Sequence, residues 1–244
     1  MDVRGKQIIV TGGVKGLGRA MVEMLVAREA KVTVFDIHTT GFEELEKIGV
    51  RCIACDVTNY DEINAALEIF GGAPDVLINN AGILYSAPLI KLGEDGLRVH
   101  AQEAWDRVLK TNLSSVFYVT AHVVAKMIAT RTKGVVVNIG SVSAAGNPGA
   151  SAYSAAKAGV HALTRAWAKE LGPMGIRVIA IAPGFMDTDS AHAATSENAL
   201  RETIKRVPLR RLGKVEEVAA AVVAAIENDF FNGKVFELDG GLIV

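Results

Sequence analysis

Tyr153 and Lys157 are the two side chains whose spacing most directly suggests chemistry. They are four residues apart and would share one face of a helix, and of the four tyrosines only Tyr153 has a lysine at that distance. A phenol has a reference pKa of about 10, too high for proton transfer near neutral pH. A nearby lysine cation lowers that pKa, and each unit is worth about 1.4 kcal/mol. The pair therefore predicts a general acid or base.

Two polar residues earlier in the chain are candidates for the same site. Ser141 follows a β-branched run directly, so its hydroxyl could hydrogen-bond a substrate oxygen and polarise it rather than attack it. Ser143 is a rival for this role, and Ser141 could instead simply form a turn. Asn112 lies inside a helical run although asparagine is a poor helix former, which favours a special role over that of an ordinary helix residue.

A glycine-rich turn, Thr11–Gly18, follows the first β-rich run and opens a helical one. Its glycines are Gly12, Gly16 and Gly18, spaced G-x-x-x-G-x-G, which is neither G-x-G-x-x-G nor a P-loop. Such glycines permit a tight turn and close approach of the backbone to a pyrophosphate, whose charge would face the helix N-terminus. The turn, including Lys15 and Leu17, therefore predicts a nucleotide site.

Asp36 ends the second β-rich run, 18 residues after Gly18. A carboxylate there can accept hydrogen bonds from ribose hydroxyls and repel a 2′-phosphate, which favours NAD(H). Lys15 is an argument for NADP(H), which stays possible. Asp56 and Val57, after the third run, would flank an adenine, or Asp56 would only cap a turn.

The elements that must position these residues alternate between short β-branched runs and helical periodicities. We expect strands over 7–11, 31–35, 51–55, 76–79, 135–139, 177–181 and 235–238. We expect helices over 18–28, 42–47, 61–70, 104–130, 152–171 and 215–226. This alternation predicts an α/β fold: one doubly wound, Rossmann-type domain over 1–244, with a seven-stranded parallel sheet and helices on both faces.

Two longer segments, 83–103 and 185–213, interrupt the alternation where strands end. Ligands of open α/β sheets bind beyond the carboxyl ends of the strands. Both segments are therefore candidate walls, or lids, of a substrate site, with plain surface loops as the alternative.

Composition limits the possible partners and location. Half of the 244 residues are hydrophobic and 22% are charged, with a formal net charge of −1, which argues against nucleic acid or an anionic membrane as a partner. The apolar run 8–10 is too short for a signal peptide and the run 218–226 too short to cross a membrane, so we expect a cytoplasmic protein. Cys52 and Cys55 would point to opposite faces of a strand, and with no histidine motif we expect no metal site.

Taken in order, these pieces resemble the classical short-chain dehydrogenase/reductase family over essentially the whole chain. The matching pieces are Thr11–Gly18, Asn79–Gly82, Asn112, Ser141, Tyr153, Lys157 and Pro183–Gly184. The spacing of 12 from Ser141 to Tyr153 is one residue shorter than the family pattern, which keeps Ser143 in consideration.

The resemblance implies an NAD(P)-dependent oxidoreductase in which an oxidised nicotinamide helps to lower the pKa of Tyr153. It implies that Lys157 also holds the nicotinamide ribose and that Asn112 holds a water linking Lys157 to solvent. The other coenzyme contacts that it implies are Asn80, Ala81, Gly82, Pro183, Gly184, Phe185 and Thr188, the last segment contacting the carboxamide.

The substrate is less constrained. The resemblance is nearest to 3-oxoacyl reductases and 3-hydroxyacyl-CoA dehydrogenases, and the segments 83–103 and 226–240 favour the type that oxidises hydroxyacyl-CoA and some hydroxysteroids. Basic residues at 205–206 and 210–211 could attract a CoA or phosphopantetheine phosphate, or form a solvated surface. Steroid, sugar or polyketide ketones are alternatives, and so is a non-catalytic nucleotide sensor, which would be expected to lose Tyr153 or Lys157.

The family also implies a homotetramer that pairs the helices 104–130 and 152–171. The second helix carries small residues that permit close helix approach, namely Ala155, Ala156, Ala158 and Gly159. The alternative is that both helices face only their own sheet.

Overall fold

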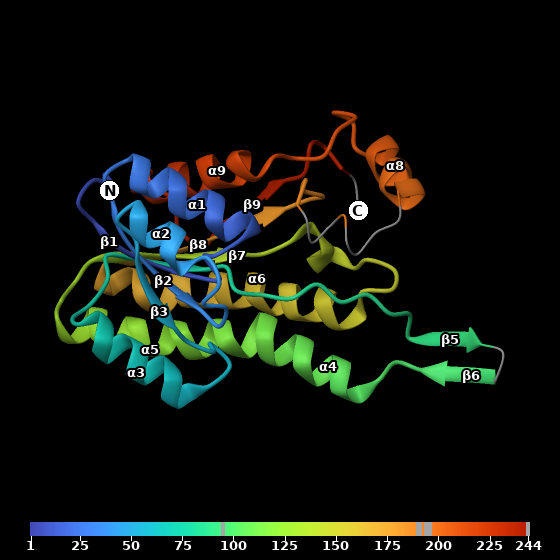
Figure 1. Cartoon of the computed structure of the whole chain (residues 1–244), viewed down its shortest axis with the longest axis horizontal. Coiled ribbons are helices and arrows are strands. Elements are labelled where there is room, and N and C mark those ends of the chain that lie inside the picture. The colour runs from blue at the N-terminus through green and yellow to red at the C-terminus, as the bar shows by residue number, and fades with distance from the viewer. Residues whose placement is uncertain (94–95, 189–191, 193–196, 243–244) are drawn as a thin grey trace.

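The computed structural model describes residues 1–93, 96–188, 192 and 197–242, and residue 199 without its side chain. Its main sheet has seven parallel strands in the order β3-β2-β1-β4-β7-β8-β9 (Figure 1). The strands are β1 (Gln7–Thr11), β2 (Lys31–Asp36), β3 (Arg51–Ala54), β4 (Val76–Asn79), β7 (Gly134–Ile139), β8 (Ile176–Pro183) and β9 (Val235–Leu238). The predicted doubly wound α/β fold is confirmed, and the strand order reverses between β1 and β4.

Two helical layers cover the sheet (Figure 1). One layer holds α1 (Gly16–Ala27), α2 (Phe42–Lys47) and α9 (Val215–Glu227), and the other α3 (Tyr60–Phe70), α5 (Ser115–Ala129) and α6 (Ser151–Leu171). Ile8 and Val10 pack into the first core and Ile9 into the second, because successive side chains of a strand point to opposite faces. Burial on both faces explains why these strands are continuous apolar runs.

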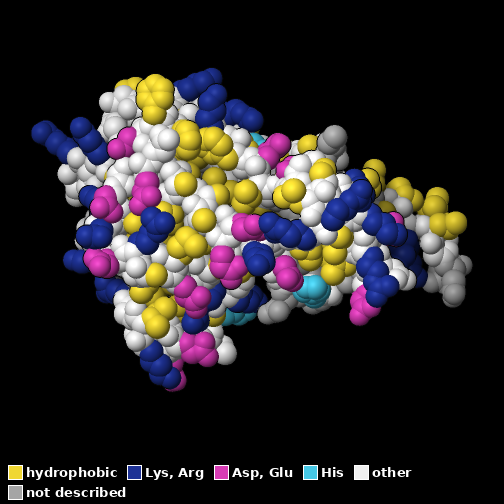
Figure 2. All heavy atoms as spheres, turned by 90° about the horizontal axis from the view of Figure 1, so that it is seen from above, with side chains coloured by type: hydrophobic (Ala, Val, Ile, Leu, Met, Phe, Trp, Pro, Cys, Tyr) yellow, Lys and Arg dark blue, Asp and Glu magenta, His cyan; other side chains and the backbone are white. Residues whose placement is uncertain are grey.

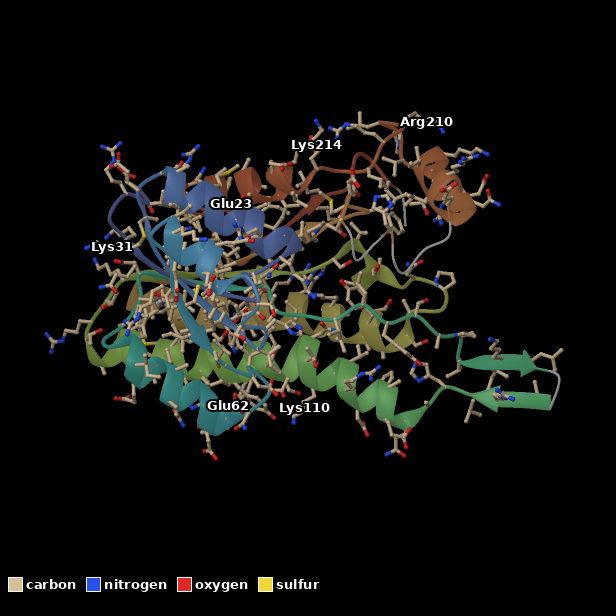
Figure 3. All side chains as sticks on the ribbon, in the orientation of Figure 1. Glu23, Lys31, Glu62, Lys110, Arg210 and Lys214 are labelled. Carbon is tan, nitrogen blue, oxygen red and sulfur yellow. The ribbon has the colours of Figure 1, made fainter. Side chains whose placement is uncertain are left out.

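The outer surfaces of these layers carry charged side chains. Glu23, Glu62 and Lys110 are exposed and extend from the helices into solvent (Figure 3). Within the described part of the chain, no helix is long and apolar enough to cross a membrane.

The long helical stretch expected over 104–130 is present as helix over 102–129, and it contains a π turn that we did not predict. It consists of α4 (Gln102–Leu109), a π-helical turn (Lys110–Ser114) and α5. The π turn contains Asn112, whose side chain is bonded outside the helix to Ile83. π turns inserted in α-helices are frequently found at functional sites.

Both interrupting segments leave the carboxyl ends of strands, β4 and β8, as expected. The first is not only loop, because it contains the hairpin β5 (Ile90–Gly93) and β6 (Gly96–Val99), which we did not predict. The second contains α8 (Glu197–Arg206). Parts of both predicted lids, 94–95, 189–191 and 193–196, lie outside the described residues.

The two cysteines point to opposite faces of the sheet, as expected. Cys55 lies in the core beneath α3 and α5, whereas Cys52 packs against the other core. Burial raises the pKa of Cys52 to about 11 and that of Cys55 to about 12, so both stay thiols. Among the residues that the structure describes, no group of histidine, cysteine and acidic side chains could hold a metal ion.

Candidate active site

The glycine turn lies against β4, where the strand order reverses. Gly12 has φ +66°, and a Cβ there would lie 2.8 Å from the Cα of Ala81. A Cβ on Gly18 would overlap the carbonyl oxygen of Gly12. No side chain caps the N-terminus of α1, where Lys15 is exposed and Gly16 has φ +57°, whereas Leu17 packs inward. The turn thus leaves backbone amides and a helix dipole available to an anion.

Hydrogen bonds tie the turn to the segment Asn80–Gly82. The Asn80 amide donates to the carbonyls of Thr11 at 3.0 Å and of Gly12 at 2.7 Å. In return, the Thr11 hydroxyl accepts from the backbone nitrogens of Asn80 at 3.0 Å and Ala81 at 3.1 Å. The structure therefore brings the glycine turn and the Asn80–Gly82 segment together at one edge of the sheet.

Asp36 is buried at the end of β2 beside the turn. Its two carboxylate oxygens accept from the backbone nitrogens of Val14 at 3.1 Å and His38 at 3.0 Å. A carboxylate has about four acceptor positions, so capacity for ribose hydroxyls remains. In contrast, Asp56 accepts from the Thr58 nitrogen at 2.8 Å and caps a turn, and Val57 is buried in the core. These contacts match the turn-cap alternative for Asp56, and its adenine contact stays a prediction.

Ser141 and Tyr153 meet at the carboxyl end of β7. Ser141 follows β7 directly, is buried, and makes a side-chain hydrogen bond with Tyr153. Its oxygen also accepts from the backbone nitrogen of Ser143 at 3.1 Å. Despite the short spacing, the structure thus brings Ser141 to the phenol.

The pKa of Tyr153 is raised, whereas a lowering by Lys157 was expected. Burial raises the pKa of the phenol, and the hydrogen bond to Ser141 opposes that effect. The expected lowering by Lys157 does not govern the pKa because removing the phenolate from water costs more. The hydroxyl therefore stays protonated at neutral pH, as an acid requires.

Lys157 lies one turn further along α6 and is held by the sheet. Its Nζ is 5.7 Å from the centroid of the Tyr153 ring and donates to the Ile139 carbonyl at 2.7 Å. The side chain is buried, and burial lowers its pKa to about 8. The last carbonyl of β7 thus fixes this amine beside Tyr153.

Asn112 is fully buried with both side-chain polar atoms engaged. Its oxygen accepts from the Ile83 nitrogen at 2.8 Å, and its amide donates to the Ile83 carbonyl at 2.9 Å. A Cβ on Gly82 would lie 2.5 Å from that oxygen, so glycine is required there. The side chain therefore positions the segment after β4, and the water predicted for Asn112 remains a prediction.

The segment predicted to contact the carboxamide begins at the end of β8. Pro183 is buried, and the Gly184 nitrogen donates to the Leu238 carbonyl at 2.9 Å. Phe185 packs against a small cluster of Val142, Val207 and Leu242. Thr188 accepts from the His192 nitrogen through its carbonyl at 3.1 Å.

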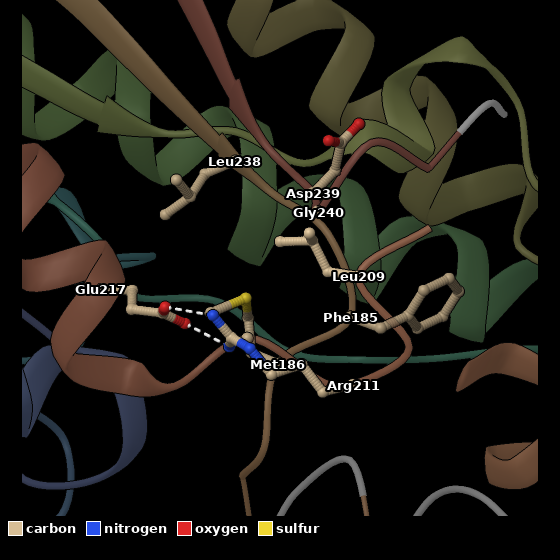
Figure 4. Close-up of a pocket in the computed structure, with 9 residues that line it drawn as sticks. Phe185, Met186, Leu209, Arg211, Glu217, Leu238, Asp239 and Gly240 are labelled. Atoms are coloured by element: carbon tan, nitrogen blue, oxygen red, sulfur yellow. Dashed lines mark hydrogen bonds and ion pairs between the residues drawn. The ribbon is translucent and has the colours of Figure 1, made fainter. Parts of the chain in front are cut away.

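The two ends of the second lid, 185–213, meet at one small pocket. Met186 and Gly213 form a parallel bridge there, and Arg211 makes two hydrogen bonds to Glu217, at 2.8 and 2.6 Å (Figure 4). The pocket is mostly apolar, with Phe185, Met186, Leu209 and Leu238 in its lining. The bridge and the Arg211–Glu217 pair join the two ends of the second lid, which we call its root.

Sequence reasoning missed a buried polar chain behind the site. Asn79 donates to Thr120 at 2.8 Å and to Asn138 at 2.9 Å, and Asn138 donates to Thr164 at 2.9 Å. These bonds join β4 and β7 to α5 and α6. The available indication was an asparagine in each of two apolar strands.

His161 is a second residue that sequence reasoning missed. It lies one turn beyond Lys157, and a Cβ on Gly140 would overlap its ring nitrogen Nε2. This Nε2 is buried without a hydrogen-bond partner within the described part of the chain. Burial and the nearby cations lower the pKa of His161 to about 4, so the ring is neutral. The ring therefore lies against the peptide between Ile139 and Ser141.

Comparisons with known proteins agree with this geometry. The short chain dehydrogenase family model matches residues 6–199. The 3-oxoacyl-acyl-carrier-protein reductase FabG of Thermotoga maritima is 38% identical over all of both chains. Human 3-hydroxyacyl-CoA dehydrogenase type-2 is 36% identical, covering 99% of this chain and 96% of its own. The chain therefore belongs to the short-chain dehydrogenase/reductase family of enzymes.

A solved structure supports the same assignment. The 3-oxoacyl-acyl-carrier-protein reductase of Brucella melitensis superposes with a TM-score of 0.89 at 32% identity, covering 100% of this chain and 93% of that one. The likeness thus extends from the sheet to both helical layers.

Proposed function

We propose that this enzyme interconverts a secondary alcohol and a ketone by hydride transfer, with Tyr153 as the acid or base. The observation that carries the proposal is the grouping of Ser141, Tyr153 and Lys157 at the edge of the sheet that holds the glycine turn. The turn fits a dinucleotide because the N-terminus of α1 has no side-chain cap and the space beside Gly16 is open, so a pyrophosphate could approach the backbone there. The family uses NAD(P), which when bound supplies or accepts the hydride.

In ketone reduction, the Tyr153 hydroxyl gives its proton to the substrate oxygen, and in alcohol oxidation it takes that proton back. Ser141 hydrogen-bonds the same oxygen and stabilises the charge that develops on it. Lys157, fixed on the Ile139 carbonyl, stabilises the phenolate and would also hold the nicotinamide ribose of a bound coenzyme. The segment from Pro183 to Thr188 would orient the nicotinamide ring.

NAD(H) is the favoured coenzyme and NADP(H) a possible one. Asp36 is buried beside the glycine turn with acceptor capacity to spare, which suits ribose hydroxyls and opposes a 2′-phosphate. Lys15 is exposed at the start of α1, where an ammonium could meet such a phosphate.

The substrate we propose is a 3-hydroxyacyl or 3-oxoacyl thioester carried by CoA or a carrier protein. The names of the Thermotoga and human relatives support this class. Basic residues near the second lid, among them Lys205 and Arg206, suit a phosphate-bearing carrier. A steroid, polyketide, sugar or other small ketone is the alternative, and a nucleotide sensor is disfavoured because Tyr153 and Lys157 are both retained.

We further propose a homotetramer that pairs α5 and α6 between copies; the cytoplasmic location stays a prediction. An open groove between these helices is lined by Leu113, Phe117, Gly159, Leu163 and Ala166, among others. Phe117 is 49% exposed in it. An apolar groove with such a side chain suits helix packing between subunits.

Replacing Tyr153 by Phe tests the chemistry. We expect turnover to fall by about 10²–10⁴-fold, while NADH binding, measured by fluorescence titration, stays within about twofold of wild type. Turnover is followed with NADH and NADPH against acetoacetyl-CoA, small ketones and steroids. Unchanged turnover in Tyr153→Phe would eliminate the acid/base assignment, and a steroid or small ketone turned over far faster than the thioester would replace the substrate class.

A further inference from the structure

The hairpin of β5 and β6 projects from the body of the molecule, beyond the start of α4 (Figure 1). Its register pairs Ile90 with Val99, Lys91 with Arg98 and Leu92 with Leu97. Residues opposite each other on an antiparallel pair share a face. One face is therefore aliphatic and comprises Ile90, Leu92, Leu97 and Val99, and the other carries the two basic residues.

The aliphatic face is exposed to an unusual degree. Ile90 is 49% exposed, and Leu92, Leu97 and Val99 are 78%, 74% and 76% exposed. Hydrophobic side chains gather over this end of the molecule in Figure 2. An isolated hairpin is marginally stable in water, and contiguous apolar patches on monomers commonly mark interaction sites. The face therefore indicates a surface that another molecule covers.

The base of the hairpin, which we call the arm, is bonded to the rest of the molecule. The His100 nitrogen donates to the Leu89 carbonyl at 2.9 Å, and the rings of Tyr85 and His100 meet edge to face, 5.6 Å apart. On the first strand's side, the Ser86 hydroxyl and the Ala87 nitrogen donate to the Gly149 carbonyl at 2.9 and 2.6 Å. The arm is thus bonded to the loop that leads into α6 and Tyr153.

Apolar exposure continues from the arm along the adjoining helices. Trp105 on α4 is 37% exposed, and Phe117 on α5 is 49% exposed beside the α5–α6 groove. The arm and these helices belong to the same side of the sheet (Figure 1). Trp105 and Phe117 therefore add exposed apolar surface on the side of the sheet that carries the arm and the groove.

We propose that the aliphatic face of the β5–β6 arm packs against a second copy of this chain. A two-fold contact is self-complementary, so one assembly covers the arms and the α5–α6 grooves of both copies together. The aliphatic face of the described arm has none of the tryptophan or phenylalanine common in membrane-surface elements, which favours a protein surface. The proposal rests on the proposed α5–α6 contact between copies, which the arm extends, but not on the proposed chemistry.

The test compares two substitutions on one strand that change the net charge equally. Leu92→Asp places a carboxylate on the aliphatic face, and Lys91→Ala removes a cation from the opposite face. Association is measured by analytical ultracentrifugation over about 0.1–50 μM, and folding by circular dichroism. We expect Leu92→Asp to weaken association by at least about 10-fold and Lys91→Ala by less than about twofold, both with wild-type melting.

Activity on dilution provides a second measurement, since the arm is bonded to the loop before Tyr153. We expect Leu92→Asp to lose specific activity at protein concentrations where wild type keeps it, and to regain it when concentrated. Phe117→Glu separates the two contacts. If Phe117→Glu dissociates the protein and Leu92→Asp does not, the helix contact stands and the arm proposal fails.

Three other results overturn the arm proposal. The first is a wild-type protein that is monomeric throughout the range. The second is equal weakening by Lys91→Ala and Leu92→Asp. The third is binding of wild type to phosphatidylglycerol vesicles that Leu92→Asp abolishes without changing association, which would assign the arm to a lipid surface. Tyr153→Phe tests the proposed chemistry alone. We expect it to lose turnover and to associate as wild type does, so each of the two proposals can fail without the other.

Discussion

The strand ends at the centre of the sheet and the two segments that extend beyond it are held in different ways. Thr11, Asn80 and Lys157 are tied to backbone groups of neighbouring strands by hydrogen bonds. The arm is bonded through Gly149, and the second lid through the bridge of Met186 with Gly213 and the bond from the Leu209 nitrogen to the Gly240 carbonyl. The difference indicates that the sheet holds the strand-end groups in place and that the two segments beyond it are freer to vary, as loops on a rigid scaffold are.

If the strand ends form a rigid frame, replacing Lys157 should change stability and turnover more than any other substitution considered below. Its pKa is lowered from 10.5 to about 8 by burial, so between these values the unfolded chain binds more protons than the folded one. The free energy of unfolding should therefore rise with pH across this window, by about 3 kcal/mol. We expect Lys157→Met to remove this rise and to lower turnover at least about 10²-fold.

Urea unfolding of both proteins at pH 7 and at pH 10.5 measures this difference, because groups common to both cancel. Parallel pH profiles for wild type and Lys157→Met would show that the amine is not buried as described. Unchanged turnover would remove it from the site.

The second effect concerns the contact between His161 and Gly140. Gly140→Ala places a Cβ against the imidazole, and overpacking of this kind costs about 1–3 kcal/mol. We expect His161→Ala to relieve most of that cost in the double variant, with a coupling energy of at least about 1 kcal/mol. Because Gly140 precedes Ser141, kcat should recover together with stability.

Thermal unfolding and steady-state kinetics of the four proteins complete the cycle. Additive losses would mean that the two residues do not touch. Recovery of stability without recovery of kcat would mean that this contact does not position Ser141.

The sequence was most informative where function depends on local spacing. The i, i+4 relation of Tyr153 to Lys157 and the end of β2 at Asp36 needed only helix and strand periodicity. The π turn at Asn112 could not be predicted in that way, because it accompanies bonds to Ile83, which is 29 residues away. The contact of His161 with Gly140 is equally a product of packing.

The β5–β6 hairpin was also not predicted, although the alternation of apolar and basic residues along its strands was visible in the sequence. Ile90 and Leu92 alternate with Lys91, and Leu97 and Val99 with Arg98, on either side of two glycines. Pro88, the two glycines and several charges nearby favoured a loop. The pair also lies apart from the main sheet, so the βα alternation gave no place for it.

A third prediction tests whether Asp36, at the end of β2, selects the coenzyme through its ribose. Asp36→Asn removes the charge that opposes a 2′-phosphate, so we expect the Kd for NADH to rise about 10-fold and the preference over NADPH to shrink. Asp56→Asn is the matched control, because Asp56 follows the next strand but caps a turn through Thr58. Calorimetric titration of both coenzymes measures the ratio. A ratio that changes equally in both variants would argue against a ribose contact by Asp36.

The smallest effect is expected at the root of the second lid, where Arg211 and Glu217 are paired. Arg211 lowers the pKa of Glu217 to about 2, so the pair persists at neutral pH and is lost only as the pH falls from about 4.5 towards 2. Exposed ion pairs contribute little to stability. We therefore expect Arg211→Met to leave melting at pH 7 and kcat nearly unchanged and to raise KM for the thioester by less than about fivefold. A large loss of kcat with unchanged KM would show that the lid root belongs to the same rigid frame as the strand ends, and the contrast between the two regions would fail.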